Sequence, residues 1–176
     1  PATGAVFGVL EAALKPLGFE VDRFVCGEAP DGPVENLFAT RAGNSDVPHF
    51  AFAGHLDVVP PGEGWSDDPF LPVERGGFLY GRGAVDMKGS IAAFVAAIPT
   101  DHAGRISLII TGDEEGPAVF GTVALIEHMK ARDLIPDLCL VGEPTSANRL
   151  GDTVKIGRRG SVNLWIEVPG MQGHVA

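Results

Sequence analysis

Apolar and polar positions along the chain follow two different periods. Residues 6–17 repeat apolar side chains every three or four positions, as an amphipathic helix does. Residues 105–111 and 136–142 are short apolar runs, which are typical of buried strands. The same criteria predict further strands at 19–26, 36–41, 49–53, 153–156 and 162–168, and further helices at 89–98 and 118–132. Strands that alternate with helices indicate an α/β layer fold with a largely parallel sheet.

Several apolar segments end at a residue that can bind a cation. The run 50–53 leads to His55 and Asp57, and two prolines then stop further strand pairing. Residues two apart on an extended backbone point to the same side, so the Asp57 carboxylate can hold the His55 imidazole in one tautomer. The other candidates follow a glycine-rich turn and two later strands: Asp86, Asp113, Glu114, Glu115 and Glu143. Ligands of open α/β sheets bind beyond the carboxyl ends of the strands, where we expect this group to meet.

A group of carboxylates at one sheet edge points to a metal site. Like charges repel, and burying carboxylates unpaired is costly, whereas one or two divalent cations would reverse the sign of that interaction. Histidine with carboxylates, and no thiolate nearby, suits a catalytic zinc, and cobalt or manganese is also compatible. A carboxylate that bridges two metals about 3.5–4 Å apart would let them activate a water together.

Each piece of this pattern also has a plainer interpretation. His55 with Asp57 is compatible with an ordinary solvated strand end, and residues 113–115 with a solvated acidic turn. Glu143 before a proline is compatible with a loop residue. The segment 81–86 begins like a dinucleotide-binding loop, but an aspartate stands where that motif needs its last glycine. The specificity of the prediction therefore comes from the combination and order of the pieces.

Charge and composition narrow the class of partner. The net charge of -10 argues against nucleic acid but leaves room for a small anionic substrate, because local basic residues can dominate one pocket. No apolar run approaches the roughly 20 residues of a membrane helix, and residues 1–4 lack a signal-peptide pattern. Cys26 and Cys139 lack metal-type spacing, and Cys139 is predicted to be a buried core thiol. We therefore expect a cytoplasmic protein without a membrane partner.

Four motifs, in order, resemble the co-catalytic zinc amidohydrolases, a family that includes deacetylases, desuccinylases, aminoacylases and carboxypeptidases. The motifs are H-L-D-V-V-P at 55–60, G-R-G-A-V-D-M-K-G at 81–89, D-E-E-G at 113–116 and G-E-P-T at 142–145. They are collinear with the family and cover nearly the whole chain. Within the family, residues 155–161 and 170–176 are most similar to the succinyl-diaminopimelate desuccinylases.

The resemblance implies a fold and a domain organisation. It implies a three-layer α/β/α zinc-peptidase-like catalytic domain over residues 1–158, and the first strands of a smaller α+β dimerisation domain over residues 159–176. It also implies a homodimer. The second zinc of the family takes a histidine from near the C-terminus, which this chain lacks, so we expect the chain to be the N-terminal part of a longer protein.

The resemblance further implies two zinc ions per subunit, with cobalt as a substitute. His55 would bind the first zinc and Asp57 would orient that histidine. Asp86 would bridge both zincs, with a cis peptide bond after it. Glu115 would bind the second zinc and Glu143 the first.

The catalytic roles also come from the resemblance. Glu114 would be the general base that takes a proton from the bridging water. Arg158 and Ser161 would hold a substrate carboxylate, and a guanidinium can grip a carboxylate in bidentate fashion. His174 would reach the active site of the partner subunit and stabilise the oxyanion there.

The expected substrate is a small anionic N-acyl amino acid. The leading expectation is hydrolysis of N-succinyl-L,L-2,6-diaminopimelate to succinate and L,L-diaminopimelate. One alternative is an acetylornithine deacetylase or a related deacylase or carboxypeptidase. Another is an inactive truncated fragment or a metal-free binding module.

Overall fold

The computed structural model describes residues 2–44, 48–157, 160, 162, 164–170 and 173. The chain divides into two compact units, Pro1–Pro144 and Thr145–Ala176. Every helix and strand found among the described residues lies in the first unit. Within the part of the chain that the structure describes, no helix has the length and apolarity that crossing a membrane requires.

A five-stranded sheet forms the centre of the first unit, in the order β1-β2-β6-β3-β7. The strands are β1 (Glu20–Cys26), β2 (Val34–Arg41), β3 (Phe50–His55), β6 (Ile106–Thr111) and β7 (Leu138–Val141). β3 pairs in parallel with β6 and β7, whereas β2 is antiparallel to both β1 and β6. The predicted α/β class is confirmed; four strands of the sheet run in the same direction and β2 runs against them, so the sheet is mixed. The loop between β1 and β2 is too short for the crossover that a parallel pair needs.

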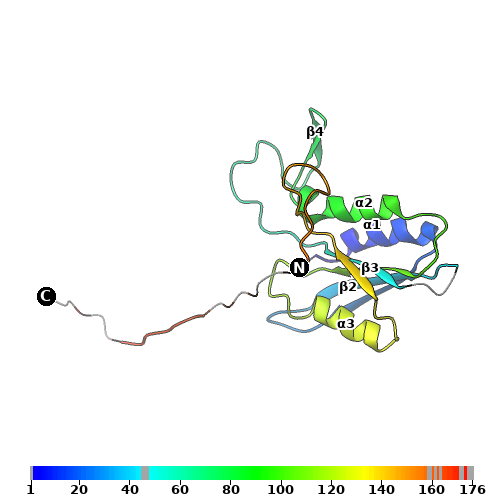
Figure 1. Ribbon diagram of the computed structural model, residues 1–176. Coiled ribbons are helices and arrows are strands. Elements are labelled where there is room, and N and C mark those ends of the chain that lie inside the picture. Colours follow the sequence, from blue (N-terminus) through cyan, green and yellow to red (C-terminus); the bar gives the residue numbers. More distant parts are fainter. Residues whose placement is uncertain are drawn as a thin grey trace. The chain divides into compact units, whose positions relative to one another are not determined.

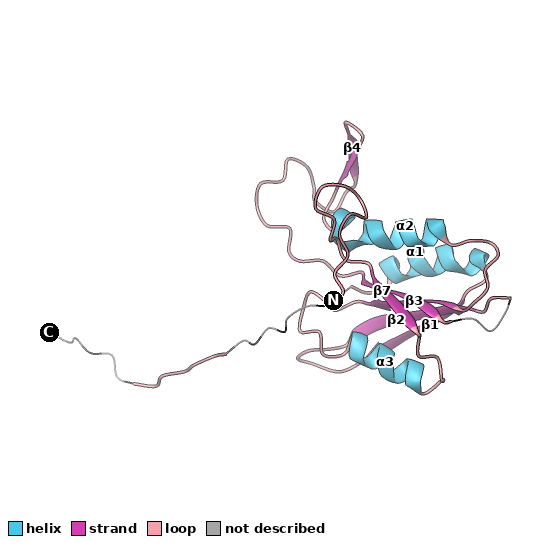
Figure 2. Cartoon of the chain, viewed as in Figure 1, coloured by secondary structure: helices cyan, strands magenta, loops and turns pink. Residues whose placement is uncertain are grey.

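Helices cover both faces of the sheet (Figures 1 and 2). α1 (Ala5–Leu14) and α2 (Gly89–Ala97) lie on one face and α3 (Thr122–Lys130) lies on the other. The two faces of β6 match this arrangement, because Leu108 and Ile110 join the core under α1 whereas Ile109 joins the core under α3. The predicted three-layer α/β/α architecture is confirmed.

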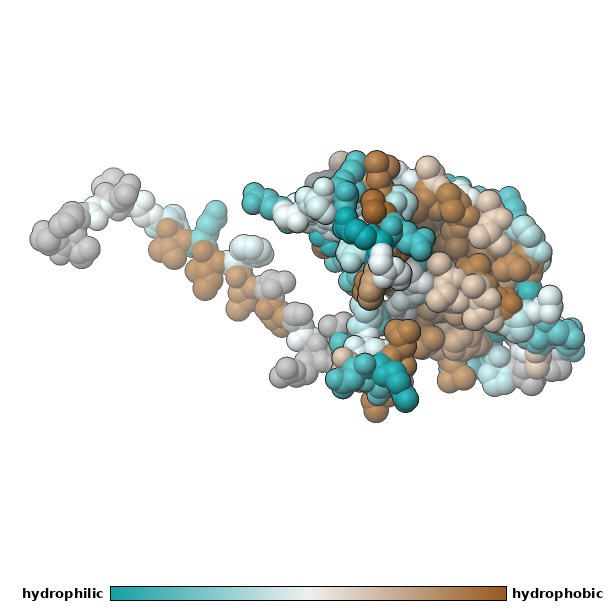
Figure 3. Space-filling model, turned by 90° about the horizontal axis from the view of Figure 1, so that it is seen from above, coloured by the Kyte–Doolittle hydropathy of each residue, from teal (hydrophilic) through white to brown (hydrophobic). Residues whose placement is uncertain are grey.

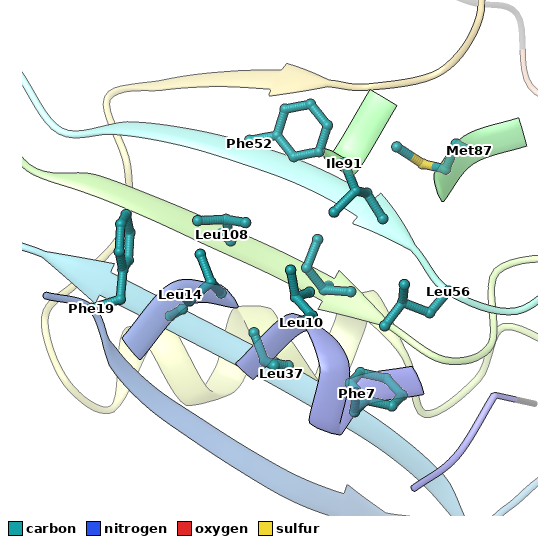
Figure 4. Close-up of a cluster of buried hydrophobic side chains, with 12 residues drawn as sticks. Phe7, Leu10, Leu14, Phe19, Leu37, Phe52, Leu56, Met87, Ile91 and Leu108 are labelled. Atoms are coloured by element: carbon teal, nitrogen blue, oxygen red, sulfur yellow. The ribbon is translucent and has the colours of Figure 1, made fainter. Parts of the chain in front are cut away.

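The larger core cluster extends from α1 to the carboxyl end of β3 (Figure 4). Phe7 of α1 and Leu108 of β6 are both fully buried in it. Leu56 and Met87 belong to the same cluster. These two residues adjoin His55 and Asp86 in sequence, so two candidate ligands are attached directly to the packed core.

Met87 occupies space that two glycines leave open. A Cβ on Gly54 of β3 would lie 2.5 Å from Met87 Cε and 2.9 Å from its Sδ. A Cβ on Gly142, just after β7, would lie 2.7 Å from the same Cε. The Met87 side chain is fully buried. Packing against these two bare backbone positions therefore fixes the turn that carries Asp86.

Two helices and the burial of one cysteine differ from their predictions. The helix predicted at 6–17 ends at Leu14 and continues as a 3₁₀ turn, Lys15–Leu17, because the ring of Pro16 and its missing N–H oppose a continued α-helix. The helix predicted at 118–132 begins only at Thr122, since Ala118 adopts the left-handed φ of 55°. Cys139 is exposed and not buried, because β7 is an edge strand.

The long segment after β3 carries a small hairpin, β4 (Val73–Arg75) and β5 (Phe78–Tyr80). Phe70 and Phe78 are 60% and 69% exposed, so they do not pin this segment to the body as their apolar character suggests. Figure 3 shows exposed apolar side chains on the surface seen from above. Trp65 instead packs locally, with the Arg82 guanidinium 5.6 Å from its ring centroid.

The second unit contains no helix or strand among its described residues. The strands predicted at 153–156 and 162–168 are therefore not found among the described residues. No strand in the described part of this unit is available to pair with their backbone. The Asp152 carboxylate accepts hydrogen bonds from three backbone amides at 147–149, which lower its pKa to about 2. Residues 158 and 159 lie outside the described residues, so the predicted domain boundary stays a prediction.

We predict that Gly54→Ala lowers the free energy of unfolding of the full-length protein by about 1–3 kcal/mol. The added methyl group would overlap the buried Met87 side chain and force it to move. Urea denaturation measures this change.

Gly8→Ala is the matched control. Gly8 lies in α1, and among the described residues outside the backbone of that helix the nearest heavy atom to its Cβ position is Arg23 Nη1 at 3.8 Å. Alanine should raise the free energy of unfolding there by about 0.5–1 kcal/mol, because it removes a helix-interior glycine. Equal effects of the two substitutions would contradict the packing account.

Candidate metal centre

The register of the parallel strands brings the predicted site residues to one edge of the sheet. His55 is opposite Thr111 at the end of β6, and Ala53 is opposite Val141 at the end of β7. The acidic turn after β6 and Glu143 after β7 therefore emerge next to His55. Asp86 reaches the same place from the short helical segment η2 (Ala84–Lys88). Gly83, just before this segment, has the left-handed φ of 81°.

His55 lies at the centre of the group, with its side chain 1% exposed. Its Nε2 atom is 3.1 Å from Asp86 Oδ1, 3.4 Å from Glu143 Oε1 and 4.0 Å from Glu114 Oε2. Bonds of about 2.0–2.1 Å to a tetrahedral zinc place two ligand atoms about 3.3 Å apart. The separations of His55 Nε2 from Asp86 and Glu143 therefore suit two ligands of one ion.

Two overlapping sets of residues have ligand atoms within 4.8 Å of one another. One set is His55, Glu114 and Glu143, and the other is His55, Asp86 and Glu115. His55 belongs to both sets. The side chains of Asp86 and Glu114 are 51% and 53% exposed, so the group is open to solvent on one side. A small molecule can reach these carboxylates.

Asp57 holds both the imidazole and the acidic turn. His55 Nδ1 is 3.1 Å from the backbone carbonyl of Asp57 and 3.4 Å from its carboxylate Oδ1, so Nδ1 faces Asp57 and Nε2 faces the other acids. The Asp57 carboxylate also accepts hydrogen bonds from the backbone amides of Glu114, at 3.0 Å, and Glu115, at 2.9 Å. This second contact was not predicted from the sequence. It ties the end of β3 to the turn after β6.

The pKa values of the site residues reflect an excess of negative charge around them. Burial would lower the pKa of His55, but the hydrogen bonds that its imidazole donates to Asp57 and the charges of Asp57 and Glu143 outweigh burial and raise the pKa to about 9. Burial, and then the neighbouring charge of Asp86, raises the pKa of Glu115 and of Glu143. Bound cations would remove this repulsion, so the donor set fits a divalent metal centre.

Met87 is a residue of the site that the sequence did not single out. The backbone amide of His55 lies 3.3 Å from Met87 Sδ, within reach of a hydrogen bond to sulfur. The peptide bond between Asp86 and Met87 is cis, as the family resemblance predicts. Met87 thus connects the turn that carries Asp86 to the strand that carries His55.

Three predicted site residues cannot be placed. Arg158, Ser161 and His174 lie outside the described residues. Their roles, and the assignment of each acid to one metal or the other, stay predictions.

We predict that metal binding to the metal-free protein releases a proton and becomes tighter as the pH rises. With a pKa of about 9, His55 is protonated at neutral pH, and a metal must displace that proton from the imidazole. Below this pKa the apparent zinc affinity should rise by up to about tenfold per pH unit, and the rise should end above it. Calorimetric titration in two buffers of different ionisation enthalpy measures the protons released. A pH-independent affinity without proton release would contradict the prediction.

Comparison with known proteins identifies the family. Residues 51–171 match peptidase family M20/M25/M40. The whole chain is 73% identical to the succinyl-diaminopimelate desuccinylase of Sphingopyxis alaskensis and covers 47% of that protein, so it spans about half the length of this relative. The structure resembles human carnosine dipeptidase 1, with a TM-score of 0.67 and 30% identity over 77% of this chain and 31% of that one. It also resembles the M20 family metallo-carboxypeptidase Sso-CP2 from Sulfolobus solfataricus, with a TM-score of 0.62 and 25% identity over the same shares. This chain belongs to peptidase family M20/M25/M40.

Proposed function

We propose that the full-length protein is a metal-dependent amidohydrolase that cleaves N-succinyl-L,L-2,6-diaminopimelate to succinate and L,L-diaminopimelate. The observation that carries the proposal is the convergence of one imidazole and four carboxylates at the carboxyl edge of the sheet. Membership of the M20 family implies that these ligands use a divalent metal. The acyl group is taken from the activity named for the Sphingopyxis alaskensis relative.

The donor set supports a two-zinc centre. We assign His55, Asp86 and Glu143 to the first zinc, and Asp86 and Glu115 to the second, with Asp86 as the bridge. Cobalt would be accepted as a substitute, because nitrogen and oxygen donors suit both ions. A further histidine, from outside this chain, would complete the second site. Bound zinc would supply Lewis-acid polarisation of the amide carbonyl and a water of lowered pKa.

The protein's own groups would orient the imidazole and move protons. Asp57 faces His55 Nδ1, so it keeps the proton on that nitrogen and leaves the Nε2 lone pair for the metal. Glu114 would accept a proton on a carboxylate oxygen and pass it to the leaving amine. Its backbone amide is fixed by Asp57, while its side chain is half exposed beside His55.

The substrate would be held by residues outside the catalytic cluster. We assign Arg158 and Ser161 to the succinyl or amino-acid carboxylate, because a positive group is needed to bring an anion close to an acidic cluster. His174 would come from the partner subunit of a homodimer and stabilise the oxyanion. Cytoplasmic location belongs to the same proposal, since L,L-diaminopimelate would be a biosynthetic product.

We predict that Glu114→Gln in the full-length protein keeps the metal but lowers kcat by about 10²–10⁴-fold. The amide has nearly the same shape as the carboxylate but does not accept the proton. Wild type and variant are assayed in parallel with N-succinyl-L,L-diaminopimelate and N-acetylornithine, and the metal content of each is measured. The wild type should strongly prefer the succinyl substrate.

Glu127→Gln makes the same chemical change on α3, where the Glu127 side chain is 65% exposed and pairs with Lys130. It should leave kcat and metal content unchanged. Near-normal turnover by Glu114→Gln would remove Glu114 from the role of base. A wild type that hydrolyses acetylornithine far faster than the succinyl substrate would refute the proposed substrate.

A further inference from the structure

Asp113, the first residue of the acidic turn after β6, is a buried carboxylate. Its side chain is 1% exposed, whereas the Glu114 side chain next to it is 53% exposed. The Asp113 Oδ2 atom accepts a hydrogen bond of 3.0 Å from the backbone amide of Ala118. Its own backbone amide donates to Thr111 Oγ1 at 3.2 Å. Asp113 therefore closes the turn by joining its first residue to the residue five positions later.

The turn that Asp113 closes carries both Glu114 and Glu115. Its opposite side is held by Asp57, whose carboxylate accepts the backbone amides of those two glutamates. Hydrogen bonds that backbone amides of this short segment donate to two buried carboxylates thus fix it from two directions. Asp57 anchors the segment to β3, whereas the bond of Asp113 determines the path of the turn itself.

Gly116 shows how closely the turn wraps around this carboxylate. A Cβ on Gly116 would lie 2.3 Å from Asp113 Oδ1, which is far inside van der Waals contact. The φ of Gly116 is not in the left-handed region, so space and not backbone conformation excludes a side chain here. The glycine that ends the D-E-E-G motif therefore leaves room for the aspartate that begins it.

The far end of the same loop is also held from the sheet. Asn36 of β2 is fully buried, and its Nδ2 donates to the backbone carbonyl of Phe120 at 2.9 Å. Asn36 is opposite Thr111 in the β2–β6 register. The loop from 113 to 120 is consequently fixed at its start, across its turn and at its end, and Asp113 takes part in the first two of these contacts.

We propose that Asp113 is a positioning residue, whose carboxylate closes the turn and thereby sets Glu114 and Glu115 relative to His55. It acts through the backbone of the turn and not by contact with the substrate or the metal. The proposal rests on the proposed function, because it takes Glu115 as a metal ligand and Glu114 as the base. It does not depend on which acyl group the enzyme removes.

The proposal is tested by titrating the metal-free, full-length protein with Co²⁺. Calorimetry and the visible absorption of bound cobalt measure the binding. Asp113→Ala should lower the affinity for one of the two Co²⁺ equivalents by about 10–100-fold, as expected when a group that orients a ligand is lost. The other equivalent, held by His55 and Glu143, should keep its affinity. Asp113→Asn should restore the weakened equivalent, because its amide oxygen accepts the same Ala118 amide proton.

Ser107→Ala is the matched control for a general loss of stability. Ser107 is fully buried at the opposite end of β6 and its hydroxyl hydrogen-bonds Thr40 at 2.9 Å. This variant should be less stable than the wild type but bind cobalt with wild-type affinities. Thermal unfolding of all variants, measured beside the titrations, separates stability from metal binding.

Three results would overturn the proposal: wild-type binding of both equivalents by Asp113→Ala, equal losses in Asp113→Asn and Asp113→Ala, or the same loss in Ser107→Ala. Activity is measured separately on the succinyl substrate. If the wild type lacks desuccinylase activity while the cobalt titrations follow the expected pattern, the proposed substrate fails and the positioning role of Asp113 is supported.

Discussion

The parallel register of β3, β6 and β7 is the constraint on which the metal centre depends. Because His55 is level with Thr111 and Ala53 with Val141, three chain segments leave the sheet at the same edge. Each segment then continues into acidic residues. The antiparallel strands β1 and β2 contribute a different function, since they extend the sheet and supply Asn36, which holds the loop after β6.

This arrangement brings negatively charged carboxylates together, which is unfavourable unless a cation is bound. Burial and neighbouring negative charge raise the pKa of Glu115 and of Glu143, and the contacts with Asp57 raise the pKa of His55 to about 9. Asp57 is the exception, because burial would raise its pKa but its contacts with His55 and two backbone amides lower it. A carboxylate with a lowered pKa behind a buried imidazole is a suitable support for a metal ligand. The same carboxylate also couples the ligand on β3 to the acidic turn.

Much of the site could be predicted from the sequence because each candidate ligand follows an apolar strand or a glycine-rich turn. The contacts that hold those ligands could not be predicted. Asn36 donates to the carbonyl of Phe120, 84 positions away, and Met87 fills a space next to Gly54 of β3 and Gly142, which follows β7. Cys139 was predicted to be buried but is exposed, as are Phe70 and Phe78, since an apolar side chain is buried only where another element packs over it. A short spacing pattern carries no information about such partners.

The central claim, that the acids and His55 form a metal centre, is tested most directly by elemental analysis of the full-length protein after exhaustive dialysis. His55 is assigned to the first zinc, so His55→Ala should lower the zinc content from the two ions per chain that the account predicts to about one. His102→Ala is the control, because His102 lies in a loop and, among the hydrogen bonds of the described residues, its Nδ1 contacts only the carbonyl of Gly104. It should keep the wild-type zinc content. A folded wild type without bound metal, or equal zinc in the wild type and His55→Ala, would contradict the account.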